Sequence, residues 1–306
     1  HFNIDSRLDE LKKNGFSERE IKSIKLSLID FTNQIINKFP EISNLTQMAI
    51  DIMTKRRYLV KKKLKASKND FKSLLDASEN LLKDCHKYGT IHFSTIARIA
   101  FIGSILLKSL VTEKKITQSS YEKFMNSIET VVTRFQTDLE LFNGGKISKK
   151  KFLEKYGHLR PGTYDITAKR YDQNEHFFSN MSSFKTQHPK THYKKLKIDN
   201  LKESPLNFEN TNLSKFVSNS LIYREELKFQ FTNNLSDALE YIALAAEQLG
   251  LSREDVVNID IKTILNSYKK LTKLELKKMW KEKIAINKKK KLHNNHLILP
   301  PIIFSD

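Results

Sequence analysis

Side chains that can hold or move charge are concentrated in the segment FLEKYGHLRPGTYDITAKRYDQN (152–174). Within thirteen positions this segment carries His158, Arg160, Asp165 and Arg170. An imidazole can act as acid or base near neutral pH, and a guanidinium group can hold a carboxylate or phosphate by paired hydrogen bonds. A carboxylate could hold an ammonium group or accept a proton. These residue types suit a polar acceptor in a phosphoryl transfer, in which positioning and charge stabilisation do most of the work.

The same segment contains signals that would fix the shape of a loop. A short helix is expected to begin after Ser148 and to end at Gly157, and Pro161-Gly162 indicates a stiff turn. Because most of the remaining chain is predicted to be helical, a polar loop of this kind is expected to line a cleft. The alternative is a surface loop with ordinary charges.

The elements that must position this loop are helices. Apolar residues recur at steps of three and four over most of the chain, which predicts a mainly α, multi-helix domain. Pro40 and Tyr88-Gly89-Thr90 are expected to separate neighbouring helices. Helices are expected over 3–13, 17–40, 44–65, 67–87, 91–110, 119–142, 148–156, 222–231, 236–248 and 262–291.

One long irregular excursion is expected at about 176–221. This stretch contains Pro189 and Pro205, many Ser and Asn residues and no helical period. It could serve as a linker, and it then gives a possible sub-division of the domain into 1–175 and 222–298.

Basic residues dominate the charge balance. The 306-residue chain has a formal net charge of +19, and residues 262–291 hold twelve lysines against two glutamates, a local excess of 12 − 2 = +10. These residues also keep an apolar stripe, which predicts a packed helix with a basic outer face. Such a face could meet nucleic acid, an anionic surface or an acidic neighbouring domain. It could equally be a solvated face, because the chain is rich in Lys, Asn and Ile together.

Composition also limits the compartment. A single cysteine, Cys85, excludes an internal disulfide framework and indicates a reducing, cytoplasmic environment. It is expected to be a small buried residue on a helix. No apolar run approaches the roughly 20 residues needed to span a bilayer, so no membrane partner is expected.

Several common functional motifs are absent. The sequence contains no phosphate-binding GxxxxGK[ST] or GxGxxG loop and no GxSxG nucleophile elbow. His188 and His192 have Pro189 between them and no acidic ligand placed nearby, and His293 and His296 lie in a polar tail, so no metal site is expected. Arg98 interrupts a markedly apolar helix and must reach water or pair with an anion.

The central motif resembles that of a known group of enzymes. YGHLRPGTYDITAKRYD (156–172) resembles the YGH-R-PGE-D-R-W motif of phosphoenolpyruvate-synthase-like and rifamycin-phosphotransferase-like enzymes. The form LRPGTYDI is similar to the branch found in capsule and surface-polysaccharide loci, which includes an L-glutamine kinase. Together with the motif, four further segments bring the resemblance to about half of the chain: RLDELKKNGFSEREI, YGTIHFSTIARIAFI, FQFTNNLSDALEYIALAAEQLGLSREDV and LILPPIIFSD.

This resemblance implies a three-part transferase. An ATP-grasp domain, using ATP and Mg, phosphorylates a histidine on a swivelling domain, which carries the phosphoryl group to an acceptor domain. The chain shows neither an ATP-grasp signature nor a TxxxxHxA-type phosphohistidine motif. Residues 1–306 would therefore be the acceptor-binding domain, with 299–306 starting the linker to a swivelling domain. Such a fragment holds no cofactor and should not turn over ATP.

The resemblance also implies roles for individual residues. His158 and Asp165 would be catalytic, and the acceptor would be bound by Arg160, Tyr164, Arg170, Arg98 and Arg224. The remaining motif positions would shape the loop: Tyr156, Gly157, Pro161 and Gly162. Thr163 stands where many relatives carry glutamate, and Tyr171 where many carry tryptophan. These departures argue against phosphoenolpyruvate or rifamycin and leave L-glutamine, in capsular polysaccharide modification, as the best single acceptor.

A second hypothesis comes from the basic segment. A helical nucleic-acid-binding or scaffold protein would use the face between Lys262 and Lys291. It predicts binding whose affinity falls steeply with salt, whereas an acceptor domain should bind nucleic acid little at physiological ionic strength.

Overall fold

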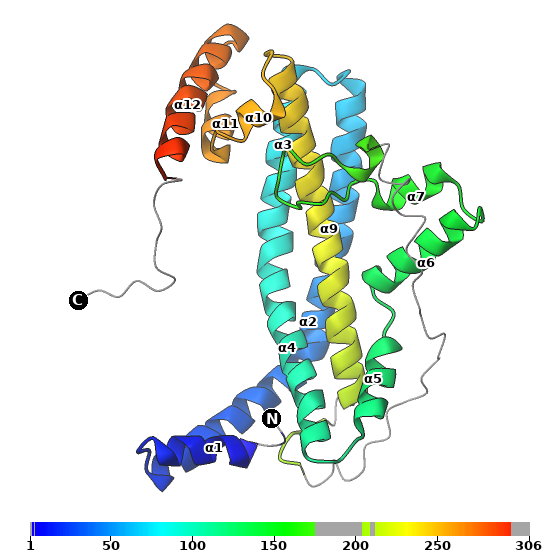
Figure 1. The fold of residues 1–306 in the computed structure, drawn as a ribbon, viewed down its shortest axis with the longest axis vertical. Helices are drawn as coiled ribbons and strands as arrows, with labels where there is room; N and C mark the ends of the chain where they lie inside the picture. Colours follow the sequence, from blue (N-terminus) through cyan, green and yellow to red (C-terminus); the bar gives the residue numbers. More distant parts are fainter. Residues whose placement is uncertain (1, 3, 175–203, 209–211, 295–306) are drawn as a thin grey trace. The chain divides into compact units, whose positions relative to one another are not determined.

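The computed structural model describes residues 2, 4–174, 204–208 and 212–294 (Figure 1). Within them every regular element is a helix and no strand is present, which confirms the predicted mainly α class. The chain divides into two compact units. The first unit comprises the described residues of His1–Thr54, Cys85–Tyr156 and His176–Phe231, and the second those of Lys55–Asp84, Gly157–Glu175 and Thr232–Asp306.

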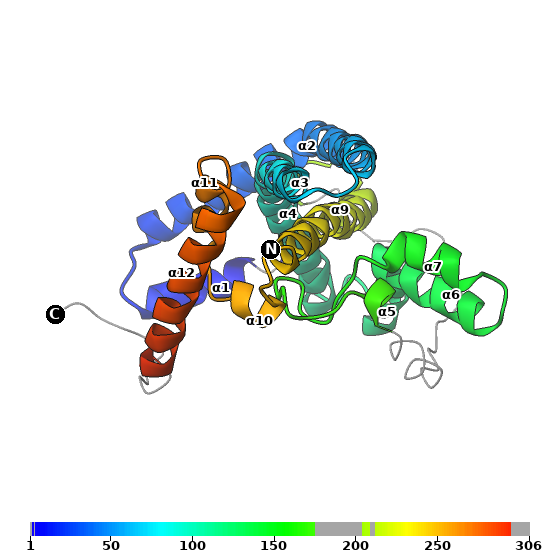
Figure 2. The same ribbon diagram turned by 90° about the horizontal axis from the view of Figure 1, so that it is seen from above.

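The first unit is organised around three helices that lie side by side in Figures 1 and 2, namely α2 (Glu18–Ala66), α4 (Ile91–Thr112) and α9 (Leu213–Glu247). Gly103 allows two of them to approach closely, because a Cβ there would lie 3.4 Å from the Cα of Val217. The unit also contains α1 (Ile4–Lys13), η1 (Cys85–Thr90), α5 (Gln118–Asn126), α6 (Val131–Asn143) and α7 (Lys149–Tyr156).

Helix α4 is central to this core. Its fully buried side chains include Ile96, Leu107 and Leu110. The continuous helical run Phe71–Thr112 is long and apolar enough to cross a membrane by length and composition. A core helix passes the same test, and α4 packs in the core of the first unit.

The second unit has its own core. It joins the end of α2, helix α3 (Phe71–Asp84), the C-terminal part of α9 and three helices that follow it: α10 (Arg253–Val256), α11 (Ile261–Ser267) and α12 (Lys273–Asn294). Trp280 is fully buried and donates its indole N–H to Ser267 Oγ at 3.3 Å. Ile166 brings the loop after α7 into this core.

Two predicted helix ends are wrong. Helix α2 continues through Pro40, although a proline inside a helix costs roughly 3 kcal/mol. Ile36 and Phe39 are buried just before it in the first unit's core, and this burial holds the helix together. At Gly89 a π-helical turn replaces the expected break, and a Cβ there would lie 2.7 Å from the Cβ of Phe231.

Other boundaries also differ from expectation. The helices expected over 222–231 and 236–248 form one helix, α9. Between them Thr232 and Asn234 are buried, and Asn234 Oδ1 accepts a hydrogen bond from Arg57 at 2.8 Å. Residues 119–142 instead form α5 and α6, and residues 262–291 form α11 and most of α12. Reciprocal hydrogen bonds between Thr272 and Glu275 cap the start of α12, which is therefore a separate helix from α11.

Most of the excursion expected at 176–221 lies outside the described residues. Its last part is helical, since α9 begins at Leu213. The two compact units are interleaved in sequence and do not follow the possible sub-division into 1–175 and 222–298. Residues 299–306 also lie outside the described part.

Candidate functional site

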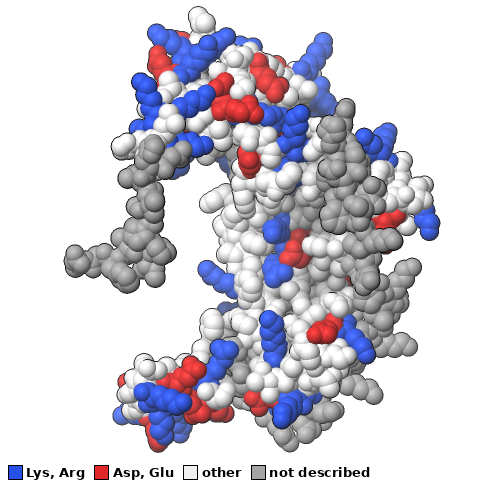
Figure 3. Space-filling model, viewed as in Figure 1, with Lys and Arg blue, Asp and Glu red and all other residues white. Residues whose placement is uncertain are grey.

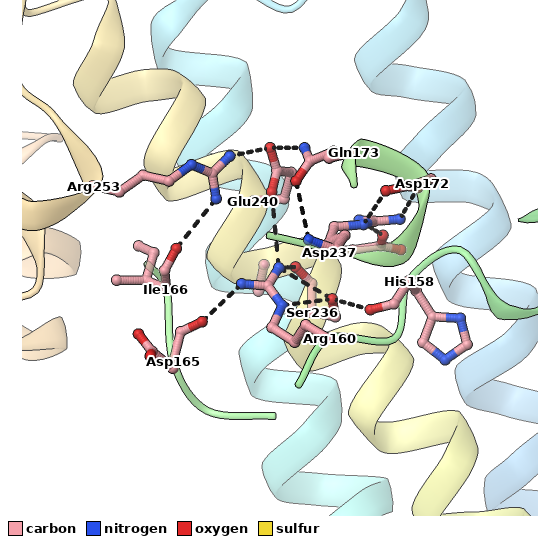
Figure 4. Close-up of polar contacts among 12 residues, drawn as sticks. His158, Arg160, Asp165, Ile166, Asp172, Gln173, Ser236, Asp237, Glu240 and Arg253 are labelled. Carbon is pink, nitrogen blue, oxygen red and sulfur yellow. Dashed lines mark hydrogen bonds and ion pairs between the residues drawn. The ribbon is translucent and has the colours of Figure 1, made fainter. Parts of the chain in front are cut away.

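The loop after α7 folds back on itself within the second unit (Figure 4). The amide of Asp172 donates to the carbonyl of Gly157 at 3.1 Å, and the amide of Tyr171 donates to that of Leu159 at 2.8 Å. A tighter turn inside the loop is closed by the amide of Asp165 on the carbonyl of Gly162 at 3.0 Å. Gly162 is required there, because a Cβ would lie 2.9 Å from the Cβ of Asp165.

Arg160 fastens the loop to α9. Its guanidinium donates to the carbonyl of Ser236 at 3.1 Å, to Ser236 Oγ at 3.2 and 3.3 Å, and to the carbonyl of Asp165 at 3.0 Å. Ser236 Oγ in turn donates to the carbonyl of His158 at 2.5 Å. Arg160 and Ser236 are both buried, so these bonds hold the loop in one conformation.

Arg170 makes the second connection to α9. Its Nη1 lies 2.7 Å from Asp237 Oδ1, while Nε and Nη2 hold both oxygens of Asp172 at 3.1 and 2.8 Å. Asp237 also pairs with Lys61 of α2 at 2.7 Å. Burial raises the pKa of Asp237, but Lys61 and Arg170 outweigh it and hold that pKa below its ordinary value. The carboxylate is therefore ionised at neutral pH.

Glu240, one helical turn beyond Ser236, gathers a third set of contacts. Arg253 donates to its Oε1 at 2.5 Å, and Gln173 donates to the same oxygen at 2.6 Å. Arg160 lies 3.8 Å from its other oxygen. Arg253 also donates to the carbonyl of Ile166 at 3.2 Å. The loop is thus tied to α9 near both of its ends, and its middle is tied to Arg253 of α10.

His158 is a buried, uncharged imidazole, with 4% of its surface exposed. Burial lowers its pKa to about 3; Asp237 opposes this shift, whereas Arg170, Arg57 and Lys61 add to it. Arg57 is itself anchored by a 2.8 Å hydrogen bond to Asn234 Oδ1. Three cations and one carboxylate therefore act on a neutral ring. Its predicted role in proton transfer stays a prediction.

The structure does not bring the carboxylate of Asp165 into this cluster. Asp165 is exposed, and its Oδ1 accepts from the amide and hydroxyl of Thr167 at 2.8 and 2.7 Å. These bonds hold the pKa of Asp165 below its ordinary value. Tyr164 is 72% exposed at the same loop tip, and Pro161 is exposed as well. Of the two residues predicted to be catalytic, only His158 is enclosed.

Two of the predicted arginines belong to the first unit. Arg98 is exposed on α4, and no ion pair is found for it among the described residues. Arg224 pairs with Glu225 at 2.7 Å and lies over the ring of Phe101, 5.9 Å from its centroid. The unit also contains Tyr156, whose buried ring donates its hydroxyl to Asp138 at 2.7 Å.

The residues on α2 and α9 that complete the cluster were not predicted from the sequence. Along α9 they fall on neighbouring faces, with Asn234 and Asp237 three residues apart and Ser236 and Glu240 four apart. This polar spacing beside the buried apolar residues Ala238, Ile242 and Ala243 was the available signal. Lys61 and Arg57 share the same four-residue spacing on α2.

The lysines of α12 form an exposed basic surface, visible in Figure 3. Leu276, Trp280 and Ile284 anchor this helix, which confirms a packed helix with a basic outer face. Leu274 of this helix is 78% exposed and lies outside the buried apolar stripe. Among the described residues no group of three or more His, Cys, Asp or Glu side chains is arranged to hold a metal ion.

Comparisons with known proteins give no relative: no family model, no curated protein and no solved structure matches this chain.

Proposed function

We propose that this chain is the acceptor-binding part of an ATP-dependent phosphotransferase that transfers a phosphoryl group from a phosphohistidine to a small polar acceptor. The acceptor is a small polar metabolite that carries a carboxylate, with L-glutamine the best single candidate. ATP and Mg act on other parts of the enzyme, and the phosphohistidine domain is a further partner. The enzyme would act in the cytoplasm, in capsule biosynthesis.

The observation that carries this proposal is the charge distribution around His158. Arg57, Lys61 and Arg170 contribute three cations against two carboxylates, Asp237 and the Asp172 that pairs with Arg170. Such an excess in a buried setting attracts a carboxylate or phosphoryl group, because charges interact more strongly where water is excluded. Lys61 keeps 42% of its side chain exposed and can reach a ligand arriving from solvent.

The same cluster could regulate proton transfer. With its pKa near 3, His158 is a weak base in the free protein. An anionic ligand would offset the neighbouring cations and raise this pKa, making the imidazole a better proton acceptor when the site is filled. A base and a charge-neutralising cation are both needed for an amide nitrogen, which is a weak nucleophile.

The two loop arginines have different parts in this proposal. Arg160 is committed to Ser236 and to the loop backbone, so it positions the loop. Arg170 is held by Asp172 and Asp237 at the edge of the cluster, where it contributes charge. The carboxylate of Asp165 stands at the exposed loop tip, where it could receive an ammonium group from a ligand bound against the loop.

Phosphoryl transfer in the complete enzyme tests this function. With phosphohistidine formed from ATP and glutamine as acceptor, His158→Asn and Asp165→Asn should abolish transfer while phosphorylation of the carrier histidine continues. Asp9→Asn, at an exposed position on α1, serves as the control and should transfer normally. Normal transfer by both loop variants would contradict the proposal.

A further inference from the structure

A separate hollow lies in the first unit, and no residue of the loop lines it. It has a volume of about 520 Å³ and is lined by α1, the first turns of α2 and residues 204–206. Pockets that hold small molecules commonly measure about 300–1,000 Å³ and are mostly apolar. This hollow therefore has the size of a ligand site.

Its walls are mainly aliphatic. Leu8 and Leu11 come from α1, Ile24 and Leu28 from α2, and Leu206 from the segment before α9. Leu28 remains 46% exposed, so part of this apolar surface faces the hollow and solvent. Covering it with an apolar chain would be favourable by roughly 25 cal/mol per Å².

The charged residues of the hollow are mostly cationic. Arg7, Lys25 and Lys115 line it together with a single acid, Asp5. Asp5 pairs with Lys25 at 2.5 Å. Lys115 lies over the ring of Phe2, 5.8 Å from its centroid, and neither it nor Arg7 has a carboxylate partner among the described residues. Two cations thus remain for an anionic group.

We infer that this hollow binds a single-chain amphiphile, an aliphatic tail ending in one carboxylate. The tail packs against Leu8, Ile24 and Leu28, and the carboxylate meets Arg7 and Lys115. The inference does not depend on the phosphotransferase proposal, because the two sites share no residue.

Calorimetry of the 306-residue chain with dodecanoate, below its micelle-forming concentration, tests the inference. One molecule should bind per chain. Leu28→Gln should weaken binding roughly fivefold, because it places a polar group against the tail. Its control is Leu26→Gln, a neighbouring leucine that is 58% exposed and does not line the hollow; this variant should bind as the parent does.

The head group is tested in the same way. The double variant Arg7→Gln and Lys115→Gln should bind dodecanoate about five- to tenfold more weakly. Its charge-matched control replaces Arg19 and Lys108, two exposed residues outside the hollow, and should bind normally. Absence of binding, equal binding by all variants, or equally tight binding of uncharged dodecyl maltoside would overturn the inference.

Discussion

Arg170 and Asp237 form a largely buried ion pair of 2.7 Å that joins the loop after α7 to helix α9. Asp237 simultaneously holds Lys61, so one carboxylate connects three parts of the second unit. The pair stands next to His158 and sets much of the charge that acts on its ring. Both the shape of the loop and the proposed anion binding depend on it.

Asp237→Asn should destabilise the protein strongly. Removing this carboxylate leaves Arg170 and Lys61 without their shared partner, and breaking a buried pair costs about 3–5 kcal/mol. Urea denaturation measures the loss. Asp172→Asn is the control, because Asp172 also binds Arg170 but has 34% of its side chain exposed; a loss of about 1 kcal/mol is expected. Equal losses of unfolding free energy in the two variants would contradict the conclusion that Asp237 is the principal partner of Arg170 and Lys61.

Ser236→Ala should loosen the loop. It removes the hydroxyl that donates to the carbonyl of His158 and accepts from Arg160. Unfolding free energy should fall by about 1–3 kcal/mol, because buried polar groups lose their partners. Ser218→Ala, on the same helix, removes only a 3.4 Å bond to the carbonyl of Lys215 and should change stability by less than about 1 kcal/mol. The same loss in both variants would argue against a special role for Ser236.

Stability should depend on the protonation of His158. Its folded pKa of about 3 lies below the ordinary value of 6.5, so the unfolded chain takes up a proton that the folded chain refuses. The stability gained by keeping His158 neutral is fully present above pH 6.5 and is lost as the pH falls towards 3. Between pH 7 and pH 5 the free energy of unfolding should therefore fall by about 2 kcal/mol.

Replacing the histidine isolates this effect. His158→Asn should flatten the dependence of unfolding free energy on pH between 7 and 5, whatever its effect on overall stability. The exposed His86 provides the control, and His86→Asn should keep the parent slope. An unchanged slope in His158→Asn would mean that the imidazole titrates normally in the folded protein.

The basic surface of α12 separates the two functional hypotheses. An acceptor domain should bind duplex DNA weakly at physiological ionic strength, despite the nine lysines of this helix. Fluorescence anisotropy at several salt concentrations measures this. Tight binding whose logarithm falls steeply with that of the salt concentration would instead favour the nucleic-acid hypothesis. The variant with Lys289, Lys290 and Lys291 changed to Gln would then lose that binding.

Local signals in the sequence predicted much of the fold. Ser17 followed three positions later by Glu20 is a pattern that starts a helix, and Glu20 does accept from the Ser17 amide at 2.8 Å. Thr117 caps α5, where its side chain accepts from the amide of Ser120. Cys85 is buried on a helical turn. These features depend on residues a few positions apart, so the sequence alone is enough to predict them.

Long-range burial explains what could not be predicted. Two helices continue through residues that usually end a helix: α2 through Pro40, and α9 through Asn233 and Asn234. Tertiary contacts keep both helices continuous there. The loop was recognised from its own residues, and His158, Arg160 and Arg170 do come together. Their partners on α9 lie more than sixty positions away, and only the fold shows that Ser236 and Asp237 face the loop.

Calorimetric titration of this chain with L-glutamine tests whether the cluster around His158 binds the acceptor. Measurable binding is expected at millimolar ligand, weakened several-fold by Lys61→Gln and unchanged by Lys62→Gln on the exposed side of the same helix. No heat at millimolar glutamine would contradict the choice of acceptor. Binding that is identical in the parent and in Lys61→Gln would contradict the cationic cluster around His158 as its site.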